Sequence, residues 1–193
     1  MPTSTLLFNT AALEPGLILQ GRNDDSAYGK AIRGALGSWG NHTAMIVKHN
    51  TRGWLIGEAM PPRSQFTPLS AYEAMIAQGY EVRIWRVKDL TAAERIETSM
   101  YWQRYCDGIR YPAKVSMARL AIFRFVNNIP WKIKMRGQFC TELVMHALRG
   151  ATGRDPLPKP NGKTKKNSTP RTMENRYVCG LLEDWTDRAL PHS

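Results

Sequence analysis

The sequence predicts an α+β protein in which a small antiparallel sheet is packed on helices. Three observations favour this class: two short β-type runs joined by a hairpin signal, another strand pattern soon after them, and helical periodicity in the second half of the chain. The 193 residues are 42% hydrophobic and 22% charged, which is typical of a globular protein and excludes a fully disordered chain. We expect a single domain over residues 1–193, with a basic loop over residues 151–170.

Strands are predicted mainly in the first half of the chain. Residues 13–20 contain a Pro-Gly turn that feeds a short buried strand, and residues 42–48 and 54–59 are two short β-type runs. Residues 27–36 have weak helical character, and residues 80–87 give a third strand pattern. We therefore expect a core of three strands that lie close together in the sequence.

Start and stop signals predict two helices after the hairpin. Thr67-Pro68 begins a helix that Gly79 closes, in keeping with the preference for Pro at the start of a helix and Gly after its end. Thr91 and Glu94 have the spacing of a capping box, and the helix that they begin runs to about Cys106.

The last part of the chain alternates between helices and a basic loop. Residues 113–127 form a basic, aromatic helix, and residues 139–148 form another helix with Gly150 as its stop. Residues 151–170 are dense in Pro, Gly, Lys and Asn, which predicts a solvated loop with few apolar anchors. Residues 178–185 contain enough apolar side chains to dock back on the core.

The cysteines predict free thiols. Cys106, Cys140 and Cys179 are odd in number and widely spaced, and no CxxC or Cys/His cluster accompanies them. This pattern indicates neither a disulfide framework nor a zinc site, so we expect no metal and no cofactor. A cysteine with a function in this chain is better explained as a nucleophile than as a crosslink.

Cys140 has the position that a nucleophilic cysteine needs. It lies at the predicted start of a helix, after Gly137 and Gln138. The unpaired N–H groups and the partial positive charge of a helix N-terminus favour the thiolate, and the same N–H groups can bind an oxyanion. The alternative is a small buried side chain on an amphipathic helix.

A nucleophilic thiol needs a base, and the chain has four histidines. His146 follows Cys140 by six residues, which is about 240° around a helix, so its side chain points elsewhere. His49 falls in the hairpin turn and His192 at the end of the chain. His42, which begins a strand, is the remaining candidate.

The hairpin register predicts a partner for His42. Pro61-Pro62 ends the hairpin. If its loop is residues 49–53, Ala44 faces Glu58, and His42 is the diagonal neighbour of Glu58 on the same sheet face. A diagonal pair is close enough for a hydrogen bond between a carboxylate and an imidazole. Glu58 can then fix the tautomer of His42 and stabilise its imidazolium. The alternative is a half-buried strand histidine beside an edge glutamate.

Four segments of the sequence support these candidates by their order. They are Pro15-Gly16-Leu-Ile-Leu19, Asn41-His42-Thr-Ala-Met-Ile-Val47, Ile56-Gly-Glu58-Ala59 and Phe139-Cys140-Thr-Glu-Leu-Val144. The order resembles that of the circularly permuted NlpC/P60 cysteine hydrolases, the YiiX/YebB-like group related to the papain fold. The resemblance covers residues 13–150 and implies a circularly permuted papain-like fold.

The same resemblance implies roles and a substrate class. Cys140 matches the nucleophile, His42 the base and Glu58 the third polar residue, whereas Leu17 replaces an Asp that is usual in the family. The implied reaction is hydrolysis of an amide bond through an acyl-enzyme, with peptidoglycan peptides as the first substrate class. Hydrolysis of lipid acyl esters or amides on anionic membranes is the alternative within the family.

The basic charge predicts the kind of partner. The chain has 27 Lys and Arg against 16 Asp and Glu, a formal net charge of +11. Such an excess favours an anionic cell-wall polymer or membrane surface, and no helix-turn-helix, zinc-finger or RNA-recognition motif points to sequence-specific nucleic-acid binding. A non-enzymatic basic binding module is the alternative that makes no use of the thiol.

The sequence contains neither a predicted signal peptide nor a predicted transmembrane segment. The N-terminal residues lack a basic region followed by an apolar stretch, and no run of about 18 apolar residues occurs without a charge. We therefore expect synthesis in the cytoplasm, with later delivery to the cell envelope as the route to an anionic polymer.

Overall fold

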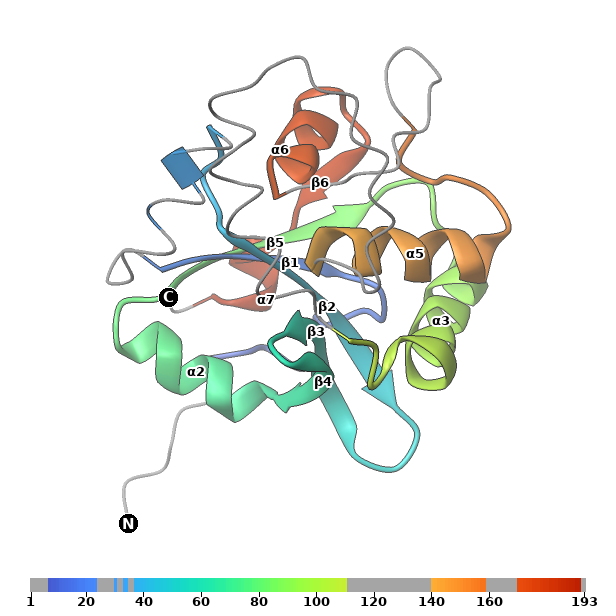
Figure 1. Cartoon of the computed structure of the whole chain (residues 1–193), viewed down its shortest axis with the longest axis horizontal. Coiled ribbons are helices and arrows are strands. Elements are labelled where there is room, and N and C mark those ends of the chain that lie inside the picture. The colour runs from blue at the N-terminus through green and yellow to red at the C-terminus, as the bar shows by residue number, and fades with distance from the viewer. Residues whose placement is uncertain are drawn as a thin grey trace.

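A six-stranded antiparallel sheet forms the centre of the computed structural model, which describes residues 7–23, 30, 33–34, 37–110, 140–158 and 170–191. The strand order is β4-β3-β2-β1-β5-β6 (Figure 1). The strands are β1 (Ile18–Arg22), β2 (His42–His49), β3 (Gly53–Met60), β4 (Arg63–Pro68), β5 (Glu81–Val87) and β6 (Leu182–Asp184). The predicted α+β class with an antiparallel sheet packed on helices is thus confirmed.

Helices cover both faces of the sheet. They are α2 (Leu69–Ala77), α3 (Ala92–Tyr101), the π-helical turn η1 (Trp102–Cys106), α5 (Cys140–Thr152), α6 (Pro170–Val178) and α7 (Thr186–Ala189). Figure 1 shows α3 and α5 side by side, with α2 at a distance from them. An apolar cluster joins α5 and η1 to one face of the sheet, and a second cluster joins α2, α7 and the N-terminal segment to the other. None of the helices in the described ranges is long and apolar enough to span a membrane.

The predicted hairpin register is confirmed. β2 and β3 pair with Lys48 opposite Trp54 and Ala44 opposite Glu58. The turn between them needs a left-handed residue, which Gly53 supplies with φ = 74°. The alternation of side chains along β2 then directs His42 and Ala44 to the face that packs against α2.

Two helix predictions are also confirmed. Thr91 and Glu94 form the complete capping box at the start of α3, and the helical segment continues through η1 to Cys106. The predicted start at Thr67-Pro68 is close to the observed one, because Pro68 is the N-cap of α2. Gly79 follows the end of α2 with φ = 93°.

The six-stranded sheet corrects the predicted three-strand core, and its two edge strands, β4 and β6, were not predicted. Pro61-Pro62 follows the end of the hairpin at Met60, as predicted, but it also forms the turn from β3 into β4, which pairs along most of β3. The residues of β4 are mostly polar and largely exposed, so the strand carries no hydrophobic alternation that a sequence pattern could detect. β6 has three residues and pairs only with the end of β5, which is too short for a pattern.

The predicted end of the helix after Cys140 was wrong. α5 continues through Gly150 to Thr152, and the left-handed residue that ends it is Gly153, with φ = 67°. Gly150 serves close packing instead, since a Cβ there would lie 2.1 Å from a ring atom of Tyr101 on α3. The loop predicted for residues 151–170 also differs from the structure, because Leu157 is fully buried in the core.

Several other predictions concern segments at or beyond the limits of the described residues. The helix predicted over residues 113–127, most of the one over residues 27–36 and residues 159–169 of the basic loop lie outside the described ranges. Within these ranges, α6 was not predicted, whereas the predicted docking of residues 178–185 is confirmed by the buried side chain of Leu182.

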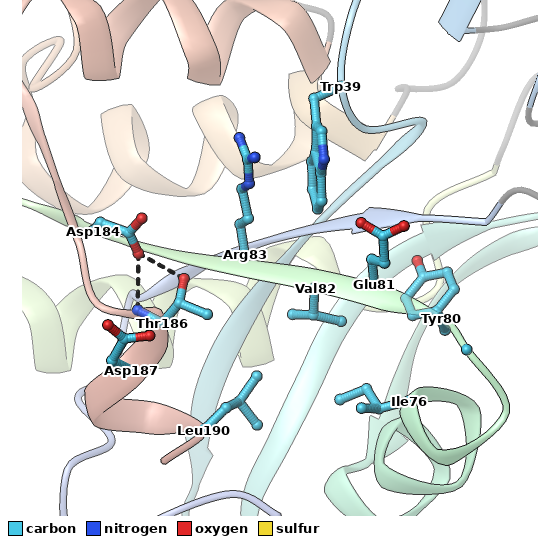
Figure 2. Close-up of a pocket in the computed structure, with 11 residues that line it drawn as sticks. Trp39, Ile76, Tyr80, Glu81, Val82, Arg83, Asp184, Thr186, Asp187 and Leu190 are labelled. Atoms are coloured by element: carbon cyan, nitrogen blue, oxygen red, sulfur yellow. Dashed lines mark hydrogen bonds between the residues drawn. The ribbon is translucent and has the colours of Figure 1, made fainter. Parts of the chain in front are cut away.

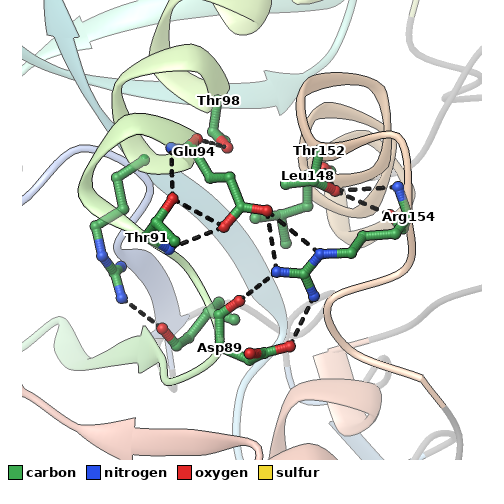
Figure 3. A network of polar contacts seen from close by, with 9 residues as sticks. Asp89, Thr91, Glu94, Thr98, Leu148, Thr152 and Arg154 are labelled. Carbon is green, nitrogen blue, oxygen red and sulfur yellow. Dashed lines mark hydrogen bonds and ion pairs between the residues drawn. The ribbon is translucent and has the colours of Figure 1, made fainter.

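Arg154 links the end of α5 to the turn before α3. Its guanidinium donates hydrogen bonds to the Asp89 carboxylate at 2.7 Å, to the Asp89 carbonyl at 2.6 Å and to the Glu94 carboxylate at 3.0 Å (Figure 3). Glu94 is at the same time part of the capping box of α3. Ion pairs this exposed each contribute about 0–1 kcal/mol, so the main effect of the network is to fix how the two helices meet.

We expect Gly57→Ala to destabilise the fold. A Cβ on Gly57 would lie 2.4 Å from a ring atom of Trp102, which is fully buried and cannot move aside. Overpacking of this kind costs about 1–3 kcal/mol, and a chain of this size then loses about 2–4 °C of melting temperature per kcal/mol. Thermal and urea denaturation measure the change. Gly34→Ala is the control, because a Cβ there meets no atom within 4 Å; equal melting temperatures for the two variants would contradict the packing argument.

Candidate active site

His42 and Glu58 form a buried hydrogen-bonded pair between neighbouring strands. The hairpin register makes them diagonal neighbours on one face of the sheet. The distance from His42 Nε2 to Glu58 Oε2 is 2.9 Å, and the side chains are only 14% and 6% exposed. The interaction predicted from the hairpin register is therefore confirmed as a contact.

The Glu58 carboxylate receives two further hydrogen bonds. The Tyr72 hydroxyl on α2 donates to Oε2 at 2.6 Å, and the Thr67 hydroxyl on β4 donates to Oε1. Burial by itself raises the pKa of Glu58, but the hydrogen bond and charge of His42, with the two hydroxyl donors, lower it to about 2. Glu58 is therefore a carboxylate at neutral pH and can hold the imidazole in place.

Cys140 completes the group from the opposite face of the sheet. It is the first residue of α5 and is 7% exposed, and α5 is anchored on the sheet through the buried side chains of Leu143 and Val144. The His42 side chain and the Thr43 backbone lie close enough to the Cys140 sulfur to lower the pKa of the thiol. Because His42 Nε2 faces Glu58, Nδ1 is the nitrogen left to share the thiol proton.

The electrostatics around Cys140 and His42 favour the charged forms of both side chains. Burial by itself raises the pKa of Cys140, but the hydrogen bond and positive charge of His42 lower it. Burial likewise lowers the pKa of His42, but its hydrogen bonds and charge interactions with Cys140 and Glu58 raise it. The structure thus favours a thiolate beside an imidazolium, which is the reactive form of a nucleophilic cysteine.

Two threonines tie the start of α5 to β2. The Thr141 hydroxyl donates to Thr43 Oγ1 at 2.9 Å, and Thr141 Oγ1 lies 3.9 Å from the Cys140 sulfur. Both threonines are fully buried. This contact crosses 98 residues of sequence, and no local pattern indicates it.

A carboxylate on α6 fixes the segment that leads into β2. Glu174 Oε1 accepts hydrogen bonds from the Ser38 hydroxyl at 2.6 Å, from the Trp39 backbone N–H at 2.8 Å and from the Gln20 side chain at 2.9 Å. The Gln20 oxygen in turn accepts a hydrogen bond from the Trp85 indole. His42 therefore begins its strand from a segment that is held in place by α6.

Within the part of the chain that the structure describes, the other histidines and cysteines do not join the site. His49 Nδ1 accepts hydrogen bonds from the turn that follows it, and His146 lies against Tyr101. Cys106 is buried in the core, where burial raises its pKa to about 12, and Cys179 is exposed. Of the histidines predicted to lie elsewhere, His192 is outside the described ranges.

Sequence reasoning missed the residues that surround the three candidates. Thr67 and Tyr72 reach Glu58 from β4 and α2, and Tyr80, just before β5, is close enough for its pKa to be raised by burial and by the charges of Glu58 and Cys140. The tyrosines follow no motif, so they could be found only once the sheet had brought the elements together.

The three candidate residues are arranged as a chain of hydrogen bonds and not as a metal site. Glu58 and Cys140 approach His42 separately, and both oxygens of Glu58 already have protein donors. Metal ligands must instead converge on one point. Across the part of the chain that the structure describes, no group of three or more His, Cys, Asp or Glu side chains is placed to hold a metal ion.

Comparison with known proteins gives a likeness of fold. The sequence matches no family model, and no curated protein is similar to it. The fold is similar to that in the crystal structure of yiiX from Escherichia coli O157:H7, which is described as a metalloprotein. The TM-score is 0.54 at 22% sequence identity, over 76% of this chain and 69% of that chain. The likeness agrees with the YiiX-like fold expected from the sequence, and at this identity it concerns the fold alone.

We expect Cys140 to react with iodoacetamide at a lower pH than an ordinary thiol does. A free cysteine has a pKa of about 8.5, so its rate of alkylation falls as the pH drops below that value. Because the pKa of Cys140 is lowered, its thiolate stays populated at lower pH, and the alkylation rate falls only as the pH passes through that lowered pKa. Peptide mass spectrometry over a pH series measures the rate, with N-acetylcysteine as the reference.

His42→Ala is the matched variant for this measurement. Loss of the imidazolium raises the pKa of Cys140, so the alkylation rate at pH 6 should fall by about tenfold or more. A wild-type profile that follows N-acetylcysteine would contradict the ion pair between Cys140 and His42.

Proposed function

We propose that this protein is a thiol hydrolase that cleaves amide bonds, with Cys140 as nucleophile, His42 as general base and acid, and Glu58 as the residue that orients His42. The observation that carries the proposal is the buried hydrogen bond between His42 and Glu58, with the Cys140 thiol beside His42 and close enough for each to shift the pKa of the other. Charges this deeply buried are costly to keep in a fold, and a lowered cysteine pKa beside an imidazolium is typical of catalytic thiols. The resemblance to the permuted NlpC/P60 hydrolases supports the same assignment.

The first half of the reaction forms an acyl-enzyme. The Cys140 thiolate attacks the carbonyl carbon of the substrate, and the carbonyl oxygen becomes an oxyanion. The backbone N–H groups in the first turn of α5, which have no partner within the helix, are suited to stabilise this charge. The carbon–nitrogen bond then breaks as the His42 imidazolium gives its proton to the leaving amine, which leaves a thioester on Cys140.

The second half of the reaction releases the acid. His42 takes a proton from a water molecule, and the resulting hydroxide attacks the thioester carbon. The carbon–sulfur bond breaks, the carboxylic acid leaves, and the thiolate and imidazolium are restored. Throughout the cycle, Glu58 keeps Nε2 of His42 protonated and faces the positive charge of the ring.

Peptide amides of cell-wall peptidoglycan are the substrate class that we propose. The net charge of +11 suits an anionic polymer, which would hold the enzyme close to its substrate. The family that the sequence resembles acts on such peptides. This substrate places the site of action at the cell envelope. Lipid acyl amides and esters on anionic membranes share the chemistry and are the alternative that an assay must separate.

We expect Cys140→Ala to abolish hydrolysis. Purified peptidoglycan fragments and anionic liposomes that carry an acyl amide are incubated with the protein, and released amines and fatty acids are quantified. Removal of the nucleophile should lower turnover by about 10³-fold or more, as it does in other enzymes that use an activated nucleophile. Release of amines from the wall fragments alone identifies the peptide substrate.

Cys179→Ala is the matched control, because it removes an exposed thiol that makes no contact with the site. It should retain full turnover. Turnover that is unchanged in Cys140→Ala would refute the thiol mechanism. Binding to wall fragments without turnover by the wild type, together with alkylation of Cys140 no faster than of Cys179, would identify a non-enzymatic binding module instead.

A further inference from the structure

A pocket opens at the outer edge of β5, at the same end of the sheet as His42. It has a volume of about 440 Å³. Its lining comes from the segment before β2, the beginning of β5, the end of α2 and the segment around α7, as Figure 2 shows. The catalytic chain described above makes no use of this pocket.

The walls of the pocket are held by their own contacts. The Arg83 guanidinium stacks over the Trp39 ring at 4.1 Å on one side of β5. On another side, the Asp184 carboxylate accepts hydrogen bonds from the backbone N–H and the hydroxyl of Thr186 (Figure 2). These contacts within the protein fix the positions of several side chains that line the pocket.

The floor of the pocket is a strand edge with free hydrogen-bonding groups. β6 and the residues after it cover the outer side of β5 only as far as Ile84, whose N–H donates to Thr186 Oγ1 and whose carbonyl accepts from the Trp185 N–H. Val82 lies two residues earlier, so its N–H and carbonyl point to the same outer side. Within the described residues no strand pairs with the outer side of β5 at Val82, since β1 lies on its inner side.

The sheet register places this edge close to the catalytic chain. Val82 pairs with Gly21 of β1, and Gly21 pairs with His42 of β2. Neighbouring strands are about 4.8 Å apart, so the backbones of Val82 and His42 are separated by about 10 Å. A ligand strand beside β5 would lie one spacing further out, about 14 Å from His42, which four extended residues can span.

Tyr80 connects the pocket to the thiol. Its hydroxyl occupies the space that a side chain at position 21 would take, 1.8 Å from where a Cβ on Gly21 would lie. The phenol therefore lies over β1 beside His42, on the side away from Glu58. Burial and the charges of Glu58 and Cys140 raise the pKa of Tyr80, so the hydroxyl stays protonated and able to donate. It forms no hydrogen bond to any residue that the structure describes.

We propose that this pocket is the subsite that binds the peptide chain of the substrate, with Val82 pairing to its backbone and Tyr80 donating a hydrogen bond to it next to the scissile amide. This inference rests on the proposed thiol hydrolase and names its substrate class more narrowly. An extended peptide can use the N–H and carbonyl of Val82, as peptides that add a strand to a sheet edge do. A fatty acyl chain has no groups that could pair with them.

Peptide electrophiles of different length test the subsite. One set carries an acyloxymethyl ketone at the C-terminus of a dipeptide or hexapeptide, and a second set carries a chloroacetyl group at the N-terminus, so that each side of the scissile bond is sampled. The inactivation rate constant of each reagent is divided by that of iodoacetamide, which is too small to reach the pocket. In at least one set, the hexapeptide should react about tenfold faster than the dipeptide, the gain expected for about 1.4 kcal/mol of added binding.

N-methylation of one reagent amide at a time shows which amides of the peptide pair with the backbone of Val82. In a paired strand only every second residue directs its backbone N–H to the neighbouring strand. N-methylation should therefore abolish the rate gain at alternate positions, about four residues from the electrophile. In the protein, Tyr80→Phe should lower the ratio of peptide to iodoacetamide rates about tenfold. Tyr105→Phe, which changes an exposed tyrosine on η1, is the matched control and should leave the ratio unchanged.

The possible outcomes distinguish this inference from the proposed function. Fast alkylation of Cys140 by iodoacetamide, with no gain from peptide length in either set, would overturn the subsite and leave the thiol hydrolase standing. Equal loss at every N-methylated position, or an unchanged ratio in Tyr80→Phe, would also overturn the subsite. Slow alkylation of Cys140 by all reagents would overturn the proposed function and the subsite with it.

Discussion

The register between β2 and β3 is the constraint on which the site depends. A shift of one residue would move Glu58 to the face that packs on η1, where Trp102 leaves room only for the glycine at position 57. The same shift would bury a carboxylate in an apolar cluster without partners, which is strongly unfavourable. Packing around Gly57 and Glu58 therefore selects one register, and that register brings His42 within hydrogen-bonding distance of Glu58.

The hydrogen bonds around the site offset the cost of burying its charges. A thiolate, an imidazolium and a carboxylate are each unstable in a dry interior, but in a row they neutralise one another in part. Tyr72 and Thr67 donate to the carboxylate, and the backbone of Thr43 stabilises the sulfur. These donors belong to three different elements, α2, β4 and β2, so the charged state of Cys140 depends on the complete fold and not on α5 alone.

Local patterns predicted the parts of the site, and tertiary contacts were needed to assemble it. The turn sequence before Gly53 determines which residues of β2 and β3 face each other, and this was sufficient to pair His42 with Glu58. The position of Cys140 against β2 depends on packing between segments about 98 residues apart, and the sequence suggested it only by elimination among the histidines and through the family resemblance. β4 could not be predicted, because a polar edge strand has no hydrophobic alternation. Tyr80 could not be predicted either, because its role depends on an empty space above another strand.

That empty space makes Gly21 the link between catalysis and substrate binding. Gly21 is the β1 residue between His42 and Val82, and its register partners lie on both sides of it. Any side chain at this position would displace the Tyr80 ring from its place beside His42. The phenol can occupy the gap only because the strand there carries no Cβ. The glycine thus lets a single tyrosine reach from the edge of β5 toward the thiol, and a substrate bound along that edge would meet the nucleophile across β1.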